Sequence, residues 1–176
     1  MKNGNALHVY YGDGKGKTTA AMGLAVRALG TGRRVLIAQF LKRNDSGELK
    51  SLARLDGARI VLGEPILKLT SRMTPEELAQ EKIRQRGKLE RIERIAQEAS
   101  PELIVLDEIL VAVHLKLIDE STVIADIDDW LSCSEVVCTG RWVSESILSR
   151  ADYITRMVKE RHPYDQGVKA RLGIEL

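Results

Sequence analysis

The chain has few of the features that mark secreted or membrane-spanning proteins. Its only cysteines, Cys133 and Cys138, are too few for a disulfide framework and lack the spacing of a metal site, so we expect two buried free thiols. No apolar run approaches the roughly 18 residues of a membrane span, and the opening MKNGNALHVYYGDG lacks the apolar stretch of a signal peptide. We therefore expect a cytoplasmic protein that does not bind a membrane.

The sequence also lacks a strong excess of charge. It has 27 basic and 25 acidic residues, a net charge of +2, so no overall field would hold it on nucleic acid. Aromatic residues make up 4% of the chain, and none lies between Phe40 and Trp130. What is abundant is apolar sequence, at 44%, which is enough for one globular domain over residues 1–176.

Short β-rich runs alternate with helical patterns. The predicted strands are residues 7–11, 35–40, 58–62, 103–107, 135–140 and 152–158, and some are continuously apolar, as parallel strands covered on both faces are. Helices are predicted over 17–29 and from a capping box at Thr74–Glu77 to Ser100–Pro101. The alternation predicts a three-layer α/β domain with a mainly parallel sheet and ligands at the carboxyl ends of its strands.

A glycine-rich stretch, YYGDGKGKTT at 10–19, follows the first predicted strand and opens the first predicted helix. The G-K-T of a phosphate loop stands at Gly16, Lys17 and Thr18, but Tyr11 occupies the usual first-glycine position and Gly12 comes one residue later. Such a shortened loop still lets backbone N–H groups and a helix N-terminus converge on an anion. Lys17 would then meet phosphate oxygens and Thr18 would bind Mg²⁺.

Two other readings of this stretch are weaker. A dinucleotide site would need the pattern G-x-G-x-x-G and an acidic residue after the second strand, and both are absent. A purely structural turn would not need Lys15 and Lys17 at a helix N-terminus, where cations are disfavoured without an anion. LIVLDE at 103–108 adds Asp107 and Glu108 after a buried strand, where they could hold Mg²⁺ or merely cap a helix. The two motifs together predict Mg-ATP binding on a P-loop NTPase (RecA-like) architecture.

Several segments resemble the ATP:corrinoid adenosyltransferases. These are the shortened loop at 12–19, RALGTGRRVLIAQFLK at 27–42, VLDE at 105–108, TGR at 139–141 and ADYITRMVKERHPYDQGVKARLGIE at 151–175, which is similar to the signature H-x-[FY]-D-x-G-V-x-A. The resemblance covers nearly the whole chain in order. It implies that the Co(I) of a reduced corrinoid attacks the 5′ carbon of ATP and releases the triphosphate.

The resemblance also implies roles for individual residues and partners. The triphosphate would be held by Gly12, Asp13, Gly14, Lys15, Gly16, Lys17, Thr18 and Thr19. Lys17 would balance the charge of the leaving group, and Thr18 with Glu108 would hold Mg²⁺, supported by Asp107. Further substrate contacts would come from Arg27, Phe40, Arg141, His162, Asp165 and Lys169. His162 could instead order the C-terminal loop through a hydrogen bond. A homodimer and an electron-donating flavoprotein partner are implied as well.

One departure from the family concerns aromatic residues. Where members carry Phe and Trp near the corrinoid, this chain has GEPILKLTSRMTPEE at 63–77, so Ile66, Leu67 and Leu69 would have to supply apolar bulk. Trp130 and Trp142 are interpreted as core or interface residues, although Trp142 follows TGR and could face the pocket. Two alternatives stay open: a P-loop phosphotransferase or ATPase, and a nucleotide- or corrinoid-binding module without catalysis.

Overall fold

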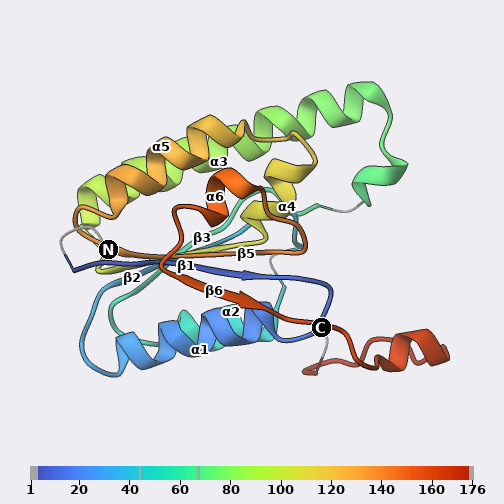
Figure 1. Ribbon diagram of the computed structural model, residues 1–176, viewed down its shortest axis with the longest axis horizontal. Coiled ribbons are helices and arrows are strands. Elements are labelled where there is room, and N and C mark those ends of the chain that lie inside the picture. Colours follow the sequence, from blue (N-terminus) through green and yellow to red (C-terminus); the bar gives the residue numbers. More distant parts are fainter. Residues whose placement is uncertain (1–3, 44, 67, 175–176) are drawn as a thin grey trace.

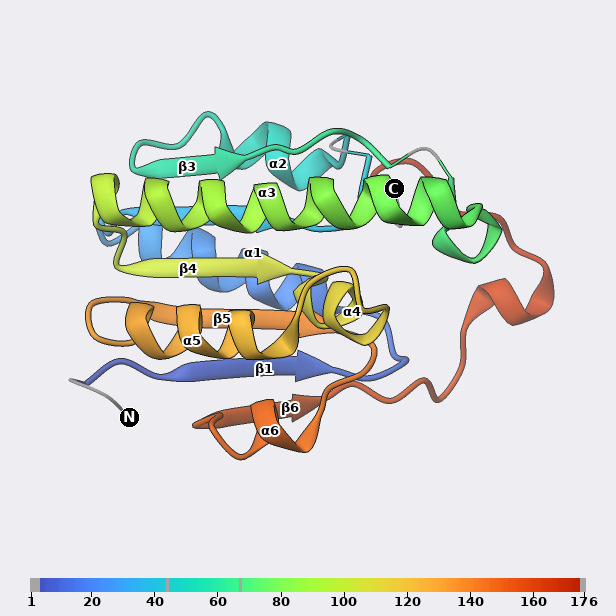
Figure 2. The same ribbon diagram turned by 90° about the horizontal axis from the view of Figure 1, so that it is seen from above.

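The fold is built on a single parallel sheet. A computed structural model describes residues 4–43, 45–66 and 68–174. Its strands are β1 (Leu7–Tyr11), β2 (Val35–Gln39), β3 (Ala58–Val61), β4 (Leu103–Asp107), β5 (Glu135–Gly140) and β6 (Tyr153–Arg156). They pair in the order β3-β2-β4-β5-β1-β6, and every pairing is parallel (Figure 2). All carboxyl ends therefore lie along one edge of the sheet.

Helices cover both faces of this sheet. They are α1 (Lys17–Leu29), α2 (Gly47–Leu52), α3 (Pro75–Ala99), α4 (Ile109–His114), α5 (Glu120–Trp130) and α6 (Glu145–Leu148), with short 3₁₀ turns η1 (Thr70–Arg72) and η2 (Pro163–Gln166). Figure 1 shows α1 and α2 on one face and the other four helices on the opposite face. The predicted three-layer α/β fold is confirmed. Among the described residues, no helix is both long and apolar enough to span a membrane.

Alternate residues of the strands feed two separate apolar cores. In β2, Leu36 and Ala38 pack in the core beneath α3, α4 and α5, whereas Val35 and Ile37 pack against α1 and α2. All five residues of β2 and of β4 are buried. Two-sided burial explains why these strands are continuously apolar in sequence, as predicted.

The long helix α3 begins and ends where the sequence predicts. The Thr74 hydroxyl accepts a hydrogen bond from the Glu77 N–H, and the Glu77 carboxylate accepts one from the Thr74 N–H. Pro75 occupies the first turn, where its missing N–H costs nothing. Ser100 ends the helix in a left-handed conformation with φ of 43°.

The structure differs from the expectations at several points. The strands end at Gln39, Val61 and Arg156, so the predicted ends at 40, 62 and 158 are too long, and β6 begins one residue later than predicted. The sequence reading did not identify α2, α4, α5 or α6; three of these have only four to six residues, too few to display a helical period. Cys138 is buried, but Cys133 is exposed because it lies in the turn after α5.

Candidate active site

Backbone geometry explains the glycines of the phosphate loop, residues 12–19. Gly12 and Gly16 both have φ of +115°, a conformation that favours glycine. A Cβ on Gly12 would lie 2.3 Å from the Met157 carbonyl oxygen, and one on Gly14 would lie 2.8 Å from backbone atoms of Met157 and Val158. The loop therefore packs directly on the chain that leaves β6. Hydrogen bonds from Gly14 N to Met157 O (2.8 Å) and from Gly12 N to Arg141 O (3.2 Å) hold it there.

The loop ends at the N-terminus of α1, which is suited to an anion. Neither a side-chain cap nor an acidic residue occupies the first turn, so the helix itself supplies no counter-charge to the positive end of its dipole. The Lys17 ammonium bends back over the loop and donates to the Gly14 carbonyl oxygen at 2.7 Å. Burial lowers the pKa of Lys17, while the Glu108 and Asp13 carboxylates oppose this shift.

Asp107 connects four parts of the site. It ends β4, is fully buried, and its Oδ1 accepts hydrogen bonds from the hydroxyls of Thr18 (2.9 Å) and Thr139 (2.7 Å). Its Oδ2 accepts one from the Gln39 side chain at 3.1 Å and lies 2.9 Å from the Lys42 ammonium. A buried carboxylate requires such partners. The loop and the ends of β2, β4 and β5 are thereby fixed relative to one another.

Glu108 presents a second carboxylate beside the loop. It caps α4 in a left-handed conformation, with φ of 63°, and its N–H donates to the Thr139 hydroxyl at 2.9 Å. Burial raises the pKa of Glu108, and the Asp107 carboxylate raises it further. Its position lines the same cavity as Lys17 and Thr18. A nearby cation would relieve the repulsion between the two carboxylates.

The chemistry of this group fits a magnesium ion. The Thr18 hydroxyl and the Glu108 carboxylate are hard oxygen ligands, which Mg²⁺ binds together with phosphate oxygens and water. A cation already stands beside them: the Lys42 ammonium lies 3.2 Å from Thr18 Oγ1 and 2.9 Å from Asp107 Oδ2. Both oxygens of Asp107 already have hydrogen-bond or ion-pair partners. Asp107 is therefore suited to orienting the Thr18 hydroxyl rather than to binding the ion itself.

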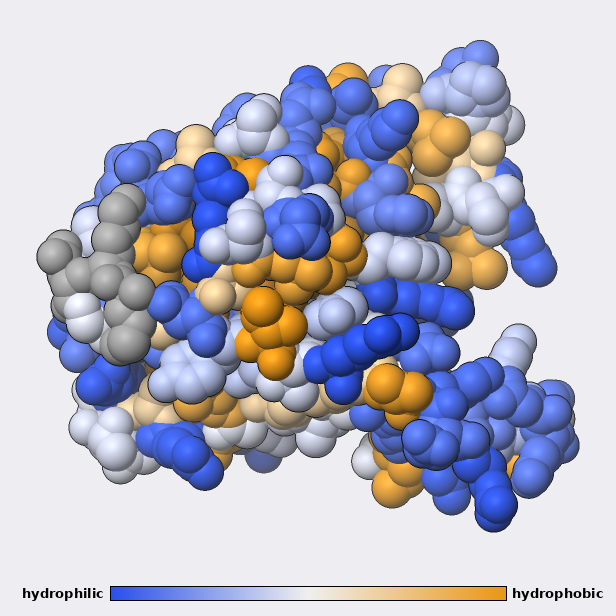
Figure 3. Space-filling view, viewed as in Figure 1, coloured by the Kyte–Doolittle hydropathy of each residue, from blue (hydrophilic) through white to orange (hydrophobic). Residues whose placement is uncertain are grey.

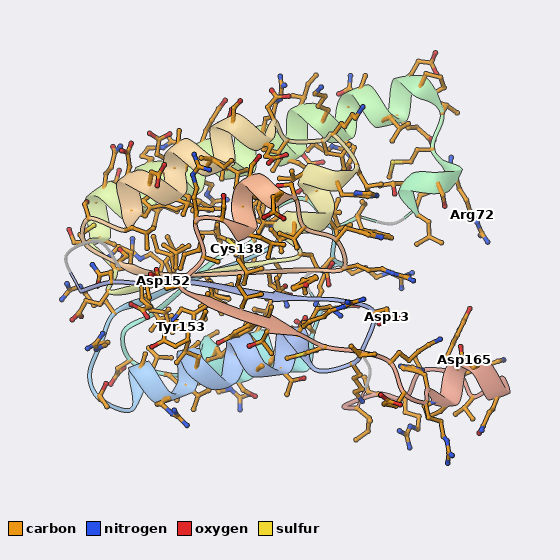
Figure 4. The ribbon with its side chains drawn as sticks, in the orientation of Figure 1. Asp13, Arg72, Cys138, Asp152, Tyr153 and Asp165 are labelled. Carbon is orange, nitrogen blue, oxygen red and sulfur yellow. The ribbon has the colours of Figure 1, made fainter. Side chains whose placement is uncertain are left out.

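A cavity of about 1270 Å³ opens in front of the loop. Its walls are formed by the loop, by residues 42–43 and 45–48, and by the C-terminal segment, residues 157–174. Figure 1 shows this segment extending past the carboxyl edge of the sheet, and Figure 3 shows its hydrophilic surface across a recess from the rest of the molecule. In Figure 4, Asp13 lies at the edge of the sheet, with Arg72 above the opening and Asp165 below it. The Lys15 ammonium reaches across to the Ile174 carbonyl oxygen at 3.2 Å.

The structure brings most of the predicted site residues to this cavity. Its lining includes Asp13, Gly14, Lys15, Gly16, Lys17, Thr18, Thr19, Glu108, His162 and Lys169. His162 also orders the C-terminal segment, because its Nδ1 accepts a hydrogen bond from Tyr164 N at 3.1 Å. Asp13 does the same by accepting one from Lys159 N at 3.2 Å, which lowers the pKa of Asp13.

Four of the six further substrate contacts predicted from the sequence are not among the residues that line this cavity. Arg27 is in the last turn of α1, about 15 Å along the helix from Lys17 at 1.5 Å per residue. Phe40 is fully buried beneath the Lys88 ammonium, so no ligand can reach its ring. Asp165 is paired with Lys159 at 2.8 Å. Arg141 borders the loop through its carbonyl group, and its guanidinium lies over Trp142.

The sequence analysis did not identify three side chains that contact the Asp107 carboxylate, nor a fourth residue that contacts one of these three. Gln39, Lys42 and Thr139 follow or end neighbouring strands, so the rule that ligands gather at strand ends could have identified them. Lys88 on α3 is buried, and its ammonium donates to the Gln39 carbonyl oxygen. Burial lowers the pKa of Lys88 to about 8. A lysine in a helical pattern gives no sign of such a contact.

Apolar residues proposed to replace the aromatic segment are only partly placed. Leu69 is 66% exposed next to η1, Ile66 is partly buried, and Leu67 lies outside the described residues. Trp130 is buried in the core, as expected, whereas Trp142 is 43% exposed and stacks on His114. Residues 63–77 contain no aromatic side chain. The exposed aromatic side chain of Trp142 is supplied instead by the segment that follows β5.

Comparison with known proteins matches nearly the whole chain, including the residues of this site, to a protein family. The sequence model of the family described as ATP:corrinoid adenosyltransferase BtuR/CobO/CobP matches residues 3–176. The corrinoid adenosyltransferase of Escherichia coli K12 is 30% identical over 168 residues, covering 95% of this chain and 83% of that protein. That of Pseudomonas aeruginosa is 32% identical over 176 residues, covering 96% and 82%. Corrinoid adenosyltransferase CobA of Salmonella typhimurium is 31% identical, covering 95% and 83%.

Proposed function

Because the chain belongs to the ATP:corrinoid adenosyltransferase family, we propose that its corrinoid substrate is cob(I)alamin and that the phosphate loop binds the triphosphate of ATP as the leaving group. The observation that carries this assignment is the position of Lys17 and Thr18, which line one cavity of about 1270 Å³ together with Glu108. The Thr18 hydroxyl also donates to the buried Asp107 carboxylate. Such a volume exceeds a typical small-molecule site, as two large substrates require.

The reaction needs positioning and charge stabilisation rather than a base. Co(I) supplies both electrons of the new cobalt–carbon bond, and the electron pair of the breaking C5′–O bond leaves with the triphosphate. Lys17 donates to the Gly14 carbonyl oxygen at the edge of the cavity; we assign it to the triphosphate, where its charge stabilises the leaving group. The α1 N-terminus adds backbone donors on the same side.

The residues beside Lys17 would hold a magnesium ion. Thr18 and Glu108 would hold the ion, and Asp107 would orient Thr18 through their 2.9 Å hydrogen bond. When bound, the ion would neutralise charge on the phosphate oxygens. Lys42 would then move from Thr18 toward the triphosphate, since two cations do not share one hydroxyl.

Four wider features complete the proposal. We assign residues 1–176 to a single domain, because both apolar cores are built on one sheet. The family resemblance supports a homodimer, an electron-donating flavoprotein as the source of Co(I), and a cytoplasmic location. Each of these is separable from the chemistry of the phosphate loop.

An anaerobic assay tests the proposed function. The protein is incubated with ATP, Mg²⁺ and chemically reduced cobalamin, and the visible spectrum and the phosphate products are followed together. We expect adenosylcobalamin and tripolyphosphate in equal amounts, with no tripolyphosphate when Co(I) is omitted. Stoichiometric ADP without adenosylated corrinoid would indicate a phosphotransferase or ATPase instead. Retained ATP binding without a cobalt–carbon bond from either cobalamin or cobinamide would indicate a non-catalytic binding module.

A further inference from the structure

A second cavity, of about 580 Å³, lies outside the phosphate site. It opens between α4, α5 and the segment that joins β5 to α6. Apolar side chains contribute to its lining: Leu110, Val113, Ile118, Val143 and Ile147. Its size is within the range of about 300–1,000 Å³ typical of small-molecule sites. The mechanism described above uses none of the residues that line it.

One wall of this cavity is aromatic. The rings of Trp142 and His114 stack with their centroids 4.3 Å apart and an interplanar angle of 17°. Both side chains line the cavity, and Trp142 is 43% exposed. The Arg141 guanidinium lies 5.1 Å from the Trp142 ring centroid. An exposed stacked pair of this kind suits a flat heteroaromatic ring.

Two lysines make the cavity suitable for an anion. Among the residues that the structure describes, the ammonium groups of Lys82 and Lys116 have no ion-pair or hydrogen-bond partner, and both line the cavity. Of the two acidic residues that line the cavity, Asp119 pairs with Arg86. Glu120 accepts a hydrogen bond from the Ser144 hydroxyl at 2.5 Å and keeps its negative charge. The two lysines outnumber that single carboxylate, so the remaining charge at this cavity is positive, which favours a phosphate.

Strand β5 and helix α4 link the walls of the two cavities. The Arg141 carbonyl accepts a hydrogen bond from Gly12 of the phosphate loop, and Trp142, the next residue, lines the second cavity. Glu108 lines the first cavity and begins α4, which carries Leu110, Val113 and His114 into the second. A substrate with a long side arm could thus have its reacting centre at the first cavity and its arm at the second.

We propose that the second cavity binds the lower nucleotide loop of a complete corrinoid, a benzimidazole ribonucleoside 3′-phosphate. The base would lie against Trp142 and His114, and the phosphate would meet Lys82 and Lys116. This inference rests on the proposed function, because cobalamin carries that loop and cobinamide lacks it. The cavity would therefore make the enzyme favour complete corrinoids over incomplete ones.

The double variant Lys82→Ala/Lys116→Ala tests the specificity directly. We expect kcat/KM for cob(I)alamin to fall about tenfold, equivalent to about 1.4 kcal/mol, while kcat/KM for cob(I)inamide and the Kd for ATP change less than about twofold. Lys50→Ala removes an exposed lysine on α2 that lines neither cavity, and it should leave all three values unchanged. Equal losses with both corrinoids, or no loss with either, would overturn the inference. The proposed function fails separately, if the wild-type protein adenosylates neither corrinoid.

A binding measurement provides a readout that does not depend on turnover. The isolated benzimidazole ribonucleoside 3′-phosphate is titrated against the protein, and tryptophan fluorescence is recorded. Trp142 is exposed and Trp130 is buried, so a ligand in the second cavity should quench mainly Trp142. We expect saturable quenching in the wild-type protein and at least tenfold weaker binding in the Lys82→Ala/Lys116→Ala variant, which keeps both indoles. Equal binding by the two proteins would contradict the assignment of the phosphate to these lysines.

Discussion

At the scale of single residues, the site depends on how buried charges are paired. Asp107 has four partners within 3.1 Å, so its carboxylate is fully satisfied and fixes the Thr18 hydroxyl. Lys17 has a backbone carbonyl as its hydrogen-bond acceptor, and it borders the large cavity. This contrast separates a residue that positions from one that is available to bind phosphate.

Replacement of Lys17 by alanine should remove most of the activity. We expect Lys17→Ala to lower kcat for adenosyl transfer by about 10²–10³-fold, because a charge aimed at the leaving group is lost. Lys50→Ala is the matched control: it removes an exposed lysine on α2 that does not line this cavity, and it should leave kcat unchanged. Steady-state kinetics under anaerobic conditions measure both, with circular dichroism to verify folding. An active Lys17→Ala protein that binds ATP normally would refute the role of the loop.

Asp126 predicts a pH dependence of stability. Burial, with Glu93 and Asp129 nearby, raises the pKa of Asp126 from its ordinary value of 3.8 to about 6 in the folded protein. The folded state thus favours the protonated form, so the stabilisation is present below about pH 4 and is lost as the pH rises through 6. Asp126→Asn should raise the Tm at pH 7.5 and leave it nearly unchanged at pH 4. Thermal melts at the two pH values measure this, and a larger gain at pH 4 would contradict the assignment.

At the scale of elements, the phosphate loop is shaped by its contact with the chain after β6. A Cβ on Gly14 would approach backbone atoms of Met157 and Val158 to 2.8 Å, and backbone atoms move less readily than side chains. Glycine is therefore required at Gly12 and Gly14 because the loop after β1 packs closely against the chain after β6. Tyr11 belongs to β1 and the loop begins at Gly12, which explains the absence of the usual first glycine.

A matched pair of glycine substitutions tests this packing. Gly14→Ala should separate the loop from Met157 and weaken ATP binding by at least about tenfold. Gly23→Ala, in the middle of α1 with nothing within 4 Å of the added Cβ, should instead stabilise the protein by about 0.5–1 kcal/mol. Denaturant unfolding and ATP titration compare the two. Normal ATP affinity in Gly14→Ala would show that the contact does not shape the site.

The elements that could be predicted are those with strong local signals. β1, β4 and β5 have the predicted bounds because each short β-rich run is followed directly by a glycine or a charged residue that ends it, and α3 is marked by its capping box. The contacts of Asp107 could not be predicted, because Thr18 and Thr139 are 89 and 32 positions away in sequence. For Arg27 and Phe40, only the family resemblance suggests a place at the site. Arg27 lies in the last turn of α1, at the other end of the helix from Lys17. The Phe40 ring is fully buried.

At the scale of the whole molecule, a C-terminal segment with little buried surface lies beyond the carboxyl edge of the sheet (Figure 1). Residues 159–174 are exposed apart from His162, which is partly buried, and none belongs to either apolar core. Several of them, including Lys169, nevertheless line the cavity in front of the phosphate loop. We therefore expect the segment to matter more for ATP binding than for stability.

Removal of residues 159–176 tests this division. We expect the truncated protein to keep its Tm within about 2 °C, because little apolar area is lost, while its affinity for ATP falls at least about tenfold. Calorimetric melts and ATP titration measure the two quantities on the same preparation. A large drop in Tm would show instead that the segment is part of the folded core, and unchanged ATP affinity would exclude it from the site.

The central claim is that the chain breaks the C5′–O bond of ATP, with the phosphate loop holding the departing triphosphate. ATP labelled with ¹⁸O at the bridging O5′ position tests this most directly, with cob(I)alamin as the second substrate and mass spectrometry of the products. We predict that the label leaves entirely with tripolyphosphate and that the nucleoside on cobalt carries none. Label retained in a nucleoside or nucleotide product would mean that a phosphorus–oxygen bond was broken, and it would contradict the account.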